Sequence, residues 1–532
     1  MTALSCAQER HGALAHLRFS ARRRTSFSAR RLHRRWVLGS ALCALVSGLA
    51  CAGPPTPRTT SPPANVAQID ARTLTEQAHI DFLIAEGMQR SRATEDLRHL
   101  TDVIGPRLSG SPGMQRAVEW TARKFANYGM DTVAREPFPF GPTWTRGPLT
   151  MRLLLPHERW LSAVSWAWAP GTSGPRAGDV VYVDATTLED FQRRFAGKLR
   201  GVWVMTSRPY PRVNPDVPSA RDSARVDSLR QLLRRQRTTE ERVFLSQQEA
   251  LFVREGIAGE LIDGGKDYGL FVMSGSPLGI SSFPQVVIGN QNFAELHRML
   301  VAGERVRVEI NASNTFGRDT VTQWNVVGEI RGSELPDEVV LVGAHLDSWD
   351  LATGATDNGA SSVAVLEAAR LIGALAATGV RPRRTIRFVL FGAEEQGLFG
   401  SRHYVARHKA ELPRYQAVLV LDNGSGRIVS IPLQGADALH RMWTELVRPL
   451  DALGPITVRS GNKGATDHMP FLQAGVPGFN YDQLPRGYDN TYHSQLDVFG
   501  QAVPEDVKQA ATVMAVNALQ LANLDRLLPR RR

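Results

Sequence analysis

Acidic residues and a histidine follow three apolar segments of this sequence, each close to the point where the segment ends. They are His345 and Asp347 after Val339–Gly343, Glu394 and Glu395 after Ile386–Phe391, and Asp422 after Ala417–Leu421. Imidazole and carboxylate groups are ligands of divalent metal ions, and a carboxylate can also take a proton from water. The spacing therefore predicts a metal site with hydrolytic chemistry.

The elements that must position these groups are indicated by the same stretch. The three apolar segments are β-branched and have the length of strands, whereas Ser361–Leu375 has helical spacing. Strand, helix and strand in this order predict a parallel sheet, and ligands bind beyond the carboxyl ends of such strands. We expect an α/β fold with a mixed, mostly parallel central sheet flanked by helices.

The adjacent acids Glu394 and Glu395 are the most informative pair. Two acids at the end of an apolar strand are costly to bury unless they bind a cation or do chemistry. Consecutive residues point in different directions, so one can bind metal while the other faces a water molecule. Metal-assisted hydrolysis needs a metal ion to acidify the water and a carboxylate to accept its proton.

Asp357 and His493 complete the candidate set. Asp357 lies among small residues in GATDNGASS, where an aspartate suits either a metal ligand or a helix N-cap, and His493 lies in the loop TYHS. Two histidines with carboxylates and no cysteine suit zinc, with manganese or cobalt as substitutes. Five ligands exceed one tetrahedral site, so we infer two metal ions about 3.5–4 Å apart, bridged by one carboxylate.

Other residues are rivals for these roles. His468 in TDHMPF is a rival ligand, although Thr466 or Asp467 there can cap a short helix, and Asp350 is a rival to Asp347. We expect Asp347 to hold the second nitrogen of His345, as carboxylates do beside metal-bound imidazoles. No P-loop or strand-linked G-x-G-x-x-G motif supports nucleotide binding, and no G-x-S-x-G elbow supports a serine mechanism.

Composition excludes further function classes. Of the net charge of +11, residues 1–52 carry +8 and the tail Arg530–Arg532 carries the remaining +3, so the body is neutral and we expect no nucleic-acid binding. The only cysteines are Cys6, Cys43 and Cys51. Because all three lie in the leader, the rest of the chain has no disulfide, thiol nucleophile or thiolate metal site.

The chain divides into four expected parts. Residues 1–52 are typical of an export signal, with a basic region, a short apolar run and a small-x-small cleavage pattern around Cys51. We therefore expect a periplasmic, secreted or lipid-anchored protein, the last through lipidation of Cys51. Residues 53–75 are a Pro/Thr-rich tether. Residues 76–162 and 306–528 predict a split catalytic domain around an inserted small α/β domain, 163–305, which contains the charged segment 216–254.

Three motifs carry a resemblance to a known family. His345–Asp347, Gly354–Gly359 and Phe391–Ser401 resemble the metal motifs of the co-catalytic di-zinc exopeptidases, which include secreted bacterial aminopeptidases, carboxypeptidase Q and glutamate carboxypeptidase II. HLDSWD, GATDNGA and TIRFVLFGAEEQGLFGS look most like the carboxypeptidase Q branch. The resemblance covers most of residues 80–160 and 310–525, and residues 163–305 resemble a protease-associated domain.

The resemblance implies a role for each site residue. The implied ligands are His345 and Asp422 on one zinc ion, Glu395 and His493 on the other, and Asp357 on both. It makes Glu394 the general base and the Asp357–Asn358 bond a cis peptide. Tyr492 resembles a tyrosine that steadies the oxyanion, with a packed loop aromatic as the alternative.

The expected function is a zinc-dependent exopeptidase of the aminopeptidase or dipeptidase type, acting on peptides with two zinc ions. No residue identifies the terminus that is recognised. Two alternatives stay open at this point: a glutaminyl cyclase-like enzyme with a single zinc ion, and a receptor-like binding module without activity. The number of zinc ions per chain distinguishes the cyclase-like enzyme from the exopeptidase, and the complete ligand set argues against the binding module.

Overall fold

The computed structural model describes residues 75–211 and 238–530. The export signal, nearly all of the tether and the candidate lipidation site Cys51 lie outside these ranges and stay predictions. The Arg-rich part of the charged segment 216–254 also lies outside them.

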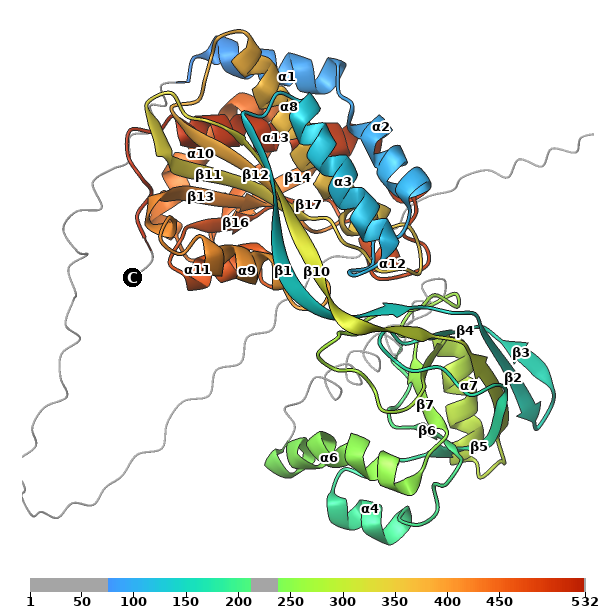
Figure 1. Cartoon of the computed structure of the whole chain (residues 1–532). Coiled ribbons are helices and arrows are strands. Elements are labelled where there is room, and N and C mark those ends of the chain that lie inside the picture. Colours follow the sequence, from blue (N-terminus) through green and yellow to red (C-terminus); the bar gives the residue numbers. More distant parts are fainter. Residues whose placement is uncertain (1–74, 212–237, 531–532) are drawn as a thin grey trace, which may run out of the picture. The chain divides into compact units, whose positions relative to one another are not determined.

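The central sheet has six strands in the order β1–β10–β12–β11–β13–β16. Their bounds are β1 Thr132–Thr145, β10 Thr315–Ile330, β12 Arg384–Phe391, β11 Leu335–His345, β13 Tyr415–Val420 and β16 Gly478–Asn480. The last four in the sheet order are parallel to one another, whereas β10 pairs antiparallel with both β1 and β12. The expected mixed, mostly parallel sheet is confirmed (Figure 1).

Both faces of β11 are buried, because helices pack on both sides of the sheet. Val340 and Val342 belong to the larger apolar cluster, and Val339 and Leu341 to a smaller cluster on the other face. This alternation has the period of a strand. Helices on the first face are α1 (Gln77–Gln89), α2 (Ala93–Arg98), α3 (Pro112–Asn127), α8 (Ala360–Ala377), α10 (His440–Val447) and α13 (Pro504–Ala522); on the second face are α9 (Phe399–Arg407) and α11 (His468–Gln473).

Helix α8 is the helix expected over Ser361–Leu375. Among the described residues, Ala355–Ala377 is the one helical stretch with the length and hydropathy of a membrane span, with a mean hydropathy of 1.5. Of the 18-residue window that has this hydropathy, 78% is buried inside the fold. Its apolar character is therefore that of a core helix. This helix forms the crossover connection between the parallel strands β11 and β12.

The helical region Ala436–Leu450 is not one continuous α-helix. Helix α10 covers only His440–Val447, and short 3-10 turns at Asp437–Leu439 and Arg448–Leu453 flank it. Pro449 has no backbone N–H and its ring clashes with the carbonyl four residues earlier, so an α-helix does not continue through it. Strands on both sides of this region form a small sheet in the order β15 (Thr457–Arg459), β14 (Ile428–Pro432) and β17 (Asp482–Gln483).

A second sheet of eight strands has the order β3–β2–β9–β5–β6–β7–β8–β4. The strands are β3 Arg159–Leu161, β2 Leu149–Leu155, β9 Arg307–Ala312, β5 Arg176–Tyr182, β6 Trp203–Met205, β7 Gly259–Asp263, β8 Gln285–Ile288 and β4 Ala163–Ser165, with helices α4 Leu188–Arg194, α6 Thr239–Glu255 and α7 Asn290–Val301. It takes strands from both sides of the span 163–305, and the limits of an inserted domain stay a prediction.

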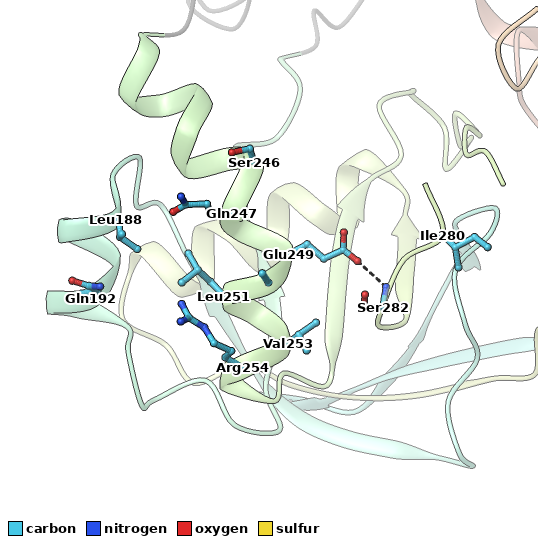
Figure 2. A pocket seen from close by; sticks show the side chains of 11 residues that line it. Leu188, Gln192, Ser246, Gln247, Glu249, Leu251, Val253, Arg254, Ile280 and Ser282 are labelled. Atoms are coloured by element: carbon cyan, nitrogen blue, oxygen red, sulfur yellow. Dashed lines mark hydrogen bonds between the residues drawn. The ribbon is translucent and has the colours of Figure 1, made fainter. Parts of the chain in front are cut away.

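A pocket in this second region lies between α4, α6 and the segment around Ile280–Ser282 (Figure 2). The Glu249 carboxylate accepts a hydrogen bond from the Ser282 backbone at 2.9 Å across it. Among the described residues that line the pocket, Glu249 and Arg254 are the only charged ones, and none is a histidine. The pocket therefore lacks the donor set of a catalytic metal site.

Candidate metal centre

Five candidate ligands come together at the carboxyl edge of the central sheet. His345 is the last residue of β11, Glu395 follows β12, and Asp422 follows β13. Asp357 lies in the turn that opens α8, and His493 follows the short helix α12 (Tyr488–Thr491). The three strands are adjacent and parallel, so their ends meet at one edge.

The ligand atoms form two groups that share Asp357. In the first, Nε2 of His345 lies 3.2 Å from Oδ1 of Asp422 and 3.4 Å from Oδ1 of Asp357. In the second, Nε2 of His493 lies 2.9 Å from Oε2 of Glu395 and 3.5 Å from Oδ2 of Asp357. The donor atoms within each group all lie within 4.8 Å of one another. Asp357 thus turns one oxygen toward each histidine.

The donor set fits zinc. It consists of two imidazoles and three carboxylates, the nitrogen and oxygen ligands that zinc accepts. His345, Asp357 and Asp422 are buried. Burial raises the pKa of Glu395 to about 7, and its Oε1 is buried without a hydrogen-bond partner among the described residues. A cation bound between these carboxylates would offset the cost of burying their charge.

Asp347 supports the site in a way that differs from the expectation. Nδ1 of His345 lies 3.0 Å from the main-chain oxygen of Asp347 and 3.6 Å from its carboxylate, so the backbone is the nearer acceptor. The carboxylate instead accepts hydrogen bonds from the backbone N–H groups of Glu394 and Glu395, at 3.1 and 3.2 Å. Its rival Asp350 forms a two-pronged ion pair with Arg146.

Glu394 faces the first group from the carboxyl end of the neighbouring strand β12. Its Oε2 lies 4.0 Å from Nε2 of His345. Burial raises the pKa of Glu394 well above its ordinary value, and the neighbouring Asp422 adds to this rise. A carboxylate with a raised pKa is suited to accept a proton near neutral pH.

Two supports of the Asp357 turn were missed by sequence reasoning. Both carboxylate oxygens of Asp497 accept backbone hydrogen bonds, from Thr356 at 2.6 Å and from Asp357 at 3.1 Å. The hydroxyl of Tyr488 donates to Oδ2 of Asp357 at 3.0 Å. Tyr488 and Asp497 lie in the same YDNTYHSQLD loop as His493, which was the available signal. The Asp357–Asn358 bond is cis, as the resemblance implied.

The remaining candidates take other positions. His468 lies apart from both groups, with Nε2 at 2.8 Å from the Lys463 carbonyl, and burial lowers its pKa to about 4. Asp467 stands at the N-cap position of α11 but makes no capping hydrogen bond, so its expected capping role is wrong. Tyr492 stacks on the ring of His493 with centroids 3.7 Å apart and is 42% exposed.

The site lies in a part of the chain that is similar to known proteins. The model of the family described as Peptidase family M28 matches residues 325–518, the stretch that contains all five candidate ligands. Carboxypeptidase Q of Mus musculus is 30% identical over 454 residues, which is 84% of this chain and 89% of that protein. Carboxypeptidase Q of Homo sapiens is also 30% identical and has the same coverage.

Solved structures show the same architecture. A peptidase M28 precursor from Shewanella amazonensis has a TM-score of 0.68 at 28% identity, covering 86% of this chain and 99% of that chain. A zinc aminopeptidase from Bacillus subtilis has a TM-score of 0.56 at 20% identity, covering 80% and 93%, and supports the fold alone.

Fold and site together define a metal-dependent peptidase with its ligands at the rim of an α/β sheet. The chain belongs to peptidase family M28. It is an exopeptidase whose substrates are peptides, and the peptide hydrolysis expected from its metal motifs is confirmed at this level.

Proposed function

We propose that this exopeptidase works with two zinc ions that share Asp357. His345 and Asp422 hold one ion, and Glu395 and His493 hold the other. The observation that carries the proposal is the division of the Asp357 carboxylate, with one oxygen 3.4 Å from His345 and the other 3.5 Å from His493. A centre with a single zinc ion would need only one of the two groups of ligands.

The bound zinc ions would supply Lewis acidity, which acidifies water and polarises the scissile carbonyl. Glu394 accepts the proton of the attacking water and delivers it to the leaving amine. Asp347 holds the backbone of Glu394 and Glu395 and so sets the direction of both side chains. The Tyr492 hydroxyl donates a hydrogen bond to the oxyanion that forms when water adds to the carbonyl.

The test of these roles is the pair Glu394→Gln and Glu395→Gln. Glu394→Gln should abolish turnover and keep two zinc ions per chain by elemental analysis, because only the proton acceptor is lost. Glu395→Gln should lose one zinc ion, because it removes a ligand. Retained turnover in Glu394→Gln would overturn the role of Glu394. One zinc ion in the unaltered chain would overturn the two-ion centre.

We further propose that the enzyme recognises a free carboxyl terminus, on the support of the carboxypeptidase Q relatives, which span 84% of the chain. A panel of dipeptides and longer peptides, blocked at either end, tests this with zinc-loaded protein. A need for the free carboxylate supports the proposal, and a need for both free ends narrows it to dipeptides. Cleavage that requires only a free amine would replace it with aminopeptidase activity.

Export is the remaining part of the proposal. The basic and apolar pattern of residues 1–52 supports transport across a membrane, and Cys51 supports a lipid tether. Fractionation of cells that express the full chain and its Cys51→Ala variant tests both. The chain should leave the cytoplasm in either form, and only the unaltered chain should stay with the membranes if the tether exists.

A further inference from the structure

Two hydrogen bonds join His493 to Met273, a residue more than two hundred positions earlier in the chain. Its Nδ1 lies 2.8 Å from the main-chain oxygen of Met273, and the Met273 backbone N–H donates to the His493 carbonyl at 2.9 Å. Met273 is fully buried and ends the segment 264–273, the first part of the connection from β7 to β8 of the second sheet. His493, a candidate ligand at the edge of the central sheet, is therefore held in place by a loop that belongs to the second sheet.

The two hydrogen bonds meet two specific needs of His493. An imidazole whose Nδ1–H donates to a carbonyl leaves the lone pair of Nε2 free, and that nitrogen faces Glu395 and Asp357. The backbone of His493 has a φ of 54°, in the left-handed region that residues with a side chain seldom adopt. Such a conformation persists only where its surroundings hold it.

The two histidines of the centre differ in this respect. The Nδ1 of His345 bonds to the main chain of Asp347, two residues away at the end of the same strand. That contact is local and forms with β11 itself. His493 has no such local acceptor for Nδ1 among the described residues, and relies on Met273.

Gln495 fixes the segment that carries Met273. Its Oε1 accepts a hydrogen bond from the Phe271 backbone at 2.9 Å, and its Nε2 donates to the Gly269 carbonyl at 3.0 Å. Lys266, at the start of the segment, donates from Nζ to the Asp489 carbonyl. One glutamine amide thus ties the His493 loop to the segment through two backbone groups.

We propose that Gln495 is a positioning residue for the second zinc site: it braces the segment 264–273, whose Met273 selects the tautomer and orientation of His493. The proposal rests on the two-zinc function above. It predicts that the second sheet's connection controls the affinity of the site formed by Asp357, Glu395 and His493, while the site of His345 and Asp422 is independent of it.

The direct test is Gln495→Leu, which keeps the side-chain volume and removes both hydrogen bonds. Zinc per chain is measured by elemental analysis across a series of buffered free zinc concentrations. The second zinc ion should bind about 10–100-fold more weakly, the usual effect of losing an outer contact of a metal ligand, and should return at higher free zinc. The first ion should bind as in the unaltered chain.

Gln291→Leu is the matched control. Gln291 lies on α7, a helix of the second sheet's region, and accepts a weak hydrogen bond from the Gly269 backbone at 3.4 Å. Unlike Gln495, it does not lie in the loop that contains His493. Its loss should leave both zinc affinities unchanged. Lys266→Met provides a second variant in case Gln495→Leu fails to fold, and should weaken the same single site.

A double-mutant cycle with His493→Ala shows whether Gln495 acts through the histidine. His493→Ala alone and together with Gln495→Leu should bind zinc equally, because the group that Gln495 positions is already gone. Unchanged zinc binding in Gln495→Leu, or an equal loss in the His493→Ala background, would overturn the proposal. Fewer than two zinc ions in the unaltered chain would instead count against the two-zinc function.

Discussion

The carboxylate of Asp497 accepts a hydrogen bond from the backbone N–H of Asp357 at 3.1 Å. It also accepts hydrogen bonds from the backbone and hydroxyl of Thr356, at 2.6 and 2.8 Å. Burial raises the pKa of Asp497 to about 7, so the carboxylate is kept in place at a cost that these bonds offset. Asp497 therefore holds the turn from which the shared ligand reaches both groups.

Asp497→Ala should weaken both zinc sites, in contrast to Gln495→Leu. The turn loses three hydrogen bonds, and Asp357 faces both histidines, so misplacing it affects both groups. We expect the affinity for each ion to fall roughly 10–100-fold. Zinc content against buffered free zinc measures this, with the exposed Asp437→Ala as the control. Loss at one site alone would contradict a shared ligand.

Removal of zinc should lower both activity and stability. The buried carboxylates repel one another without a cation, and a ligand that binds only the folded state stabilises it by about 2.7 kcal/mol per site at 100 times its Kd. Exhaustive chelation should therefore abolish hydrolysis and lower Tm, and added zinc should restore both. Full activity after complete metal removal is the contrary result.

His408 should make stability depend on pH. Burial alone lowers the pKa of His408, but hydrogen bonds to Glu136 and Glu411, at 2.8 and 3.0 Å, outweigh it and raise the pKa above its ordinary value. A raised pKa in the folded state gives stability that is present below about pH 6.5 and is lost as the pH rises through the folded value. His408→Gln should thus lower Tm more at pH 6 than at pH 9. An equal loss at both values would contradict the ion-pair explanation.

Arg107 should be essential for stability. Its guanidinium is fully buried and donates to the carbonyls of Leu346, Thr353 and Gly354 at 2.7–2.8 Å, joining the two ends of the loop between His345 and Asp357. Arg107→Met leaves these buried carbonyls without donors and should cost roughly 3 kcal/mol or more in the free energy of unfolding. Urea unfolding measures it.

The control for Arg107 is Arg441→Met. Arg441 is exposed on α10 and pairs with Glu445 four residues later. An exposed pair of this kind contributes about 0–1 kcal/mol, so the variant should unfold close to the unaltered chain. An equal effect of the two substitutions would contradict the role assigned to Arg107.

The sequence was sufficient for the sheet and for the strand-end residues of the site. Largely apolar runs predicted β11, β12 and β13, because parallel strands buried on both faces contain few polar residues. The sequence predicted local structure less well where contacts between residues far apart in the chain determine it. The stretch Gly269–Met273 has the apolar composition of a strand, but it forms only an isolated bridge between Gly265 and Phe271. Its backbone groups bond to Gln495 and His493 instead.

What the sequence determined by itself is the set of chemical groups and the edge where most of them lie. His345, Glu394, Glu395 and Asp422 each follow a parallel strand, and parallel strands bring their carboxyl ends to one edge whatever the loops do. Only the tertiary structure decided how Asp357 divides between two histidines and what holds His493. The contacts of Asp357 with His493 and Asp497, and of His493 with Met273, join residues that are more than a hundred to more than two hundred positions apart, and no local pattern encodes such distances. The support of Asp357 by Asp497 and of His493 by Met273 therefore became visible only once the chain was folded.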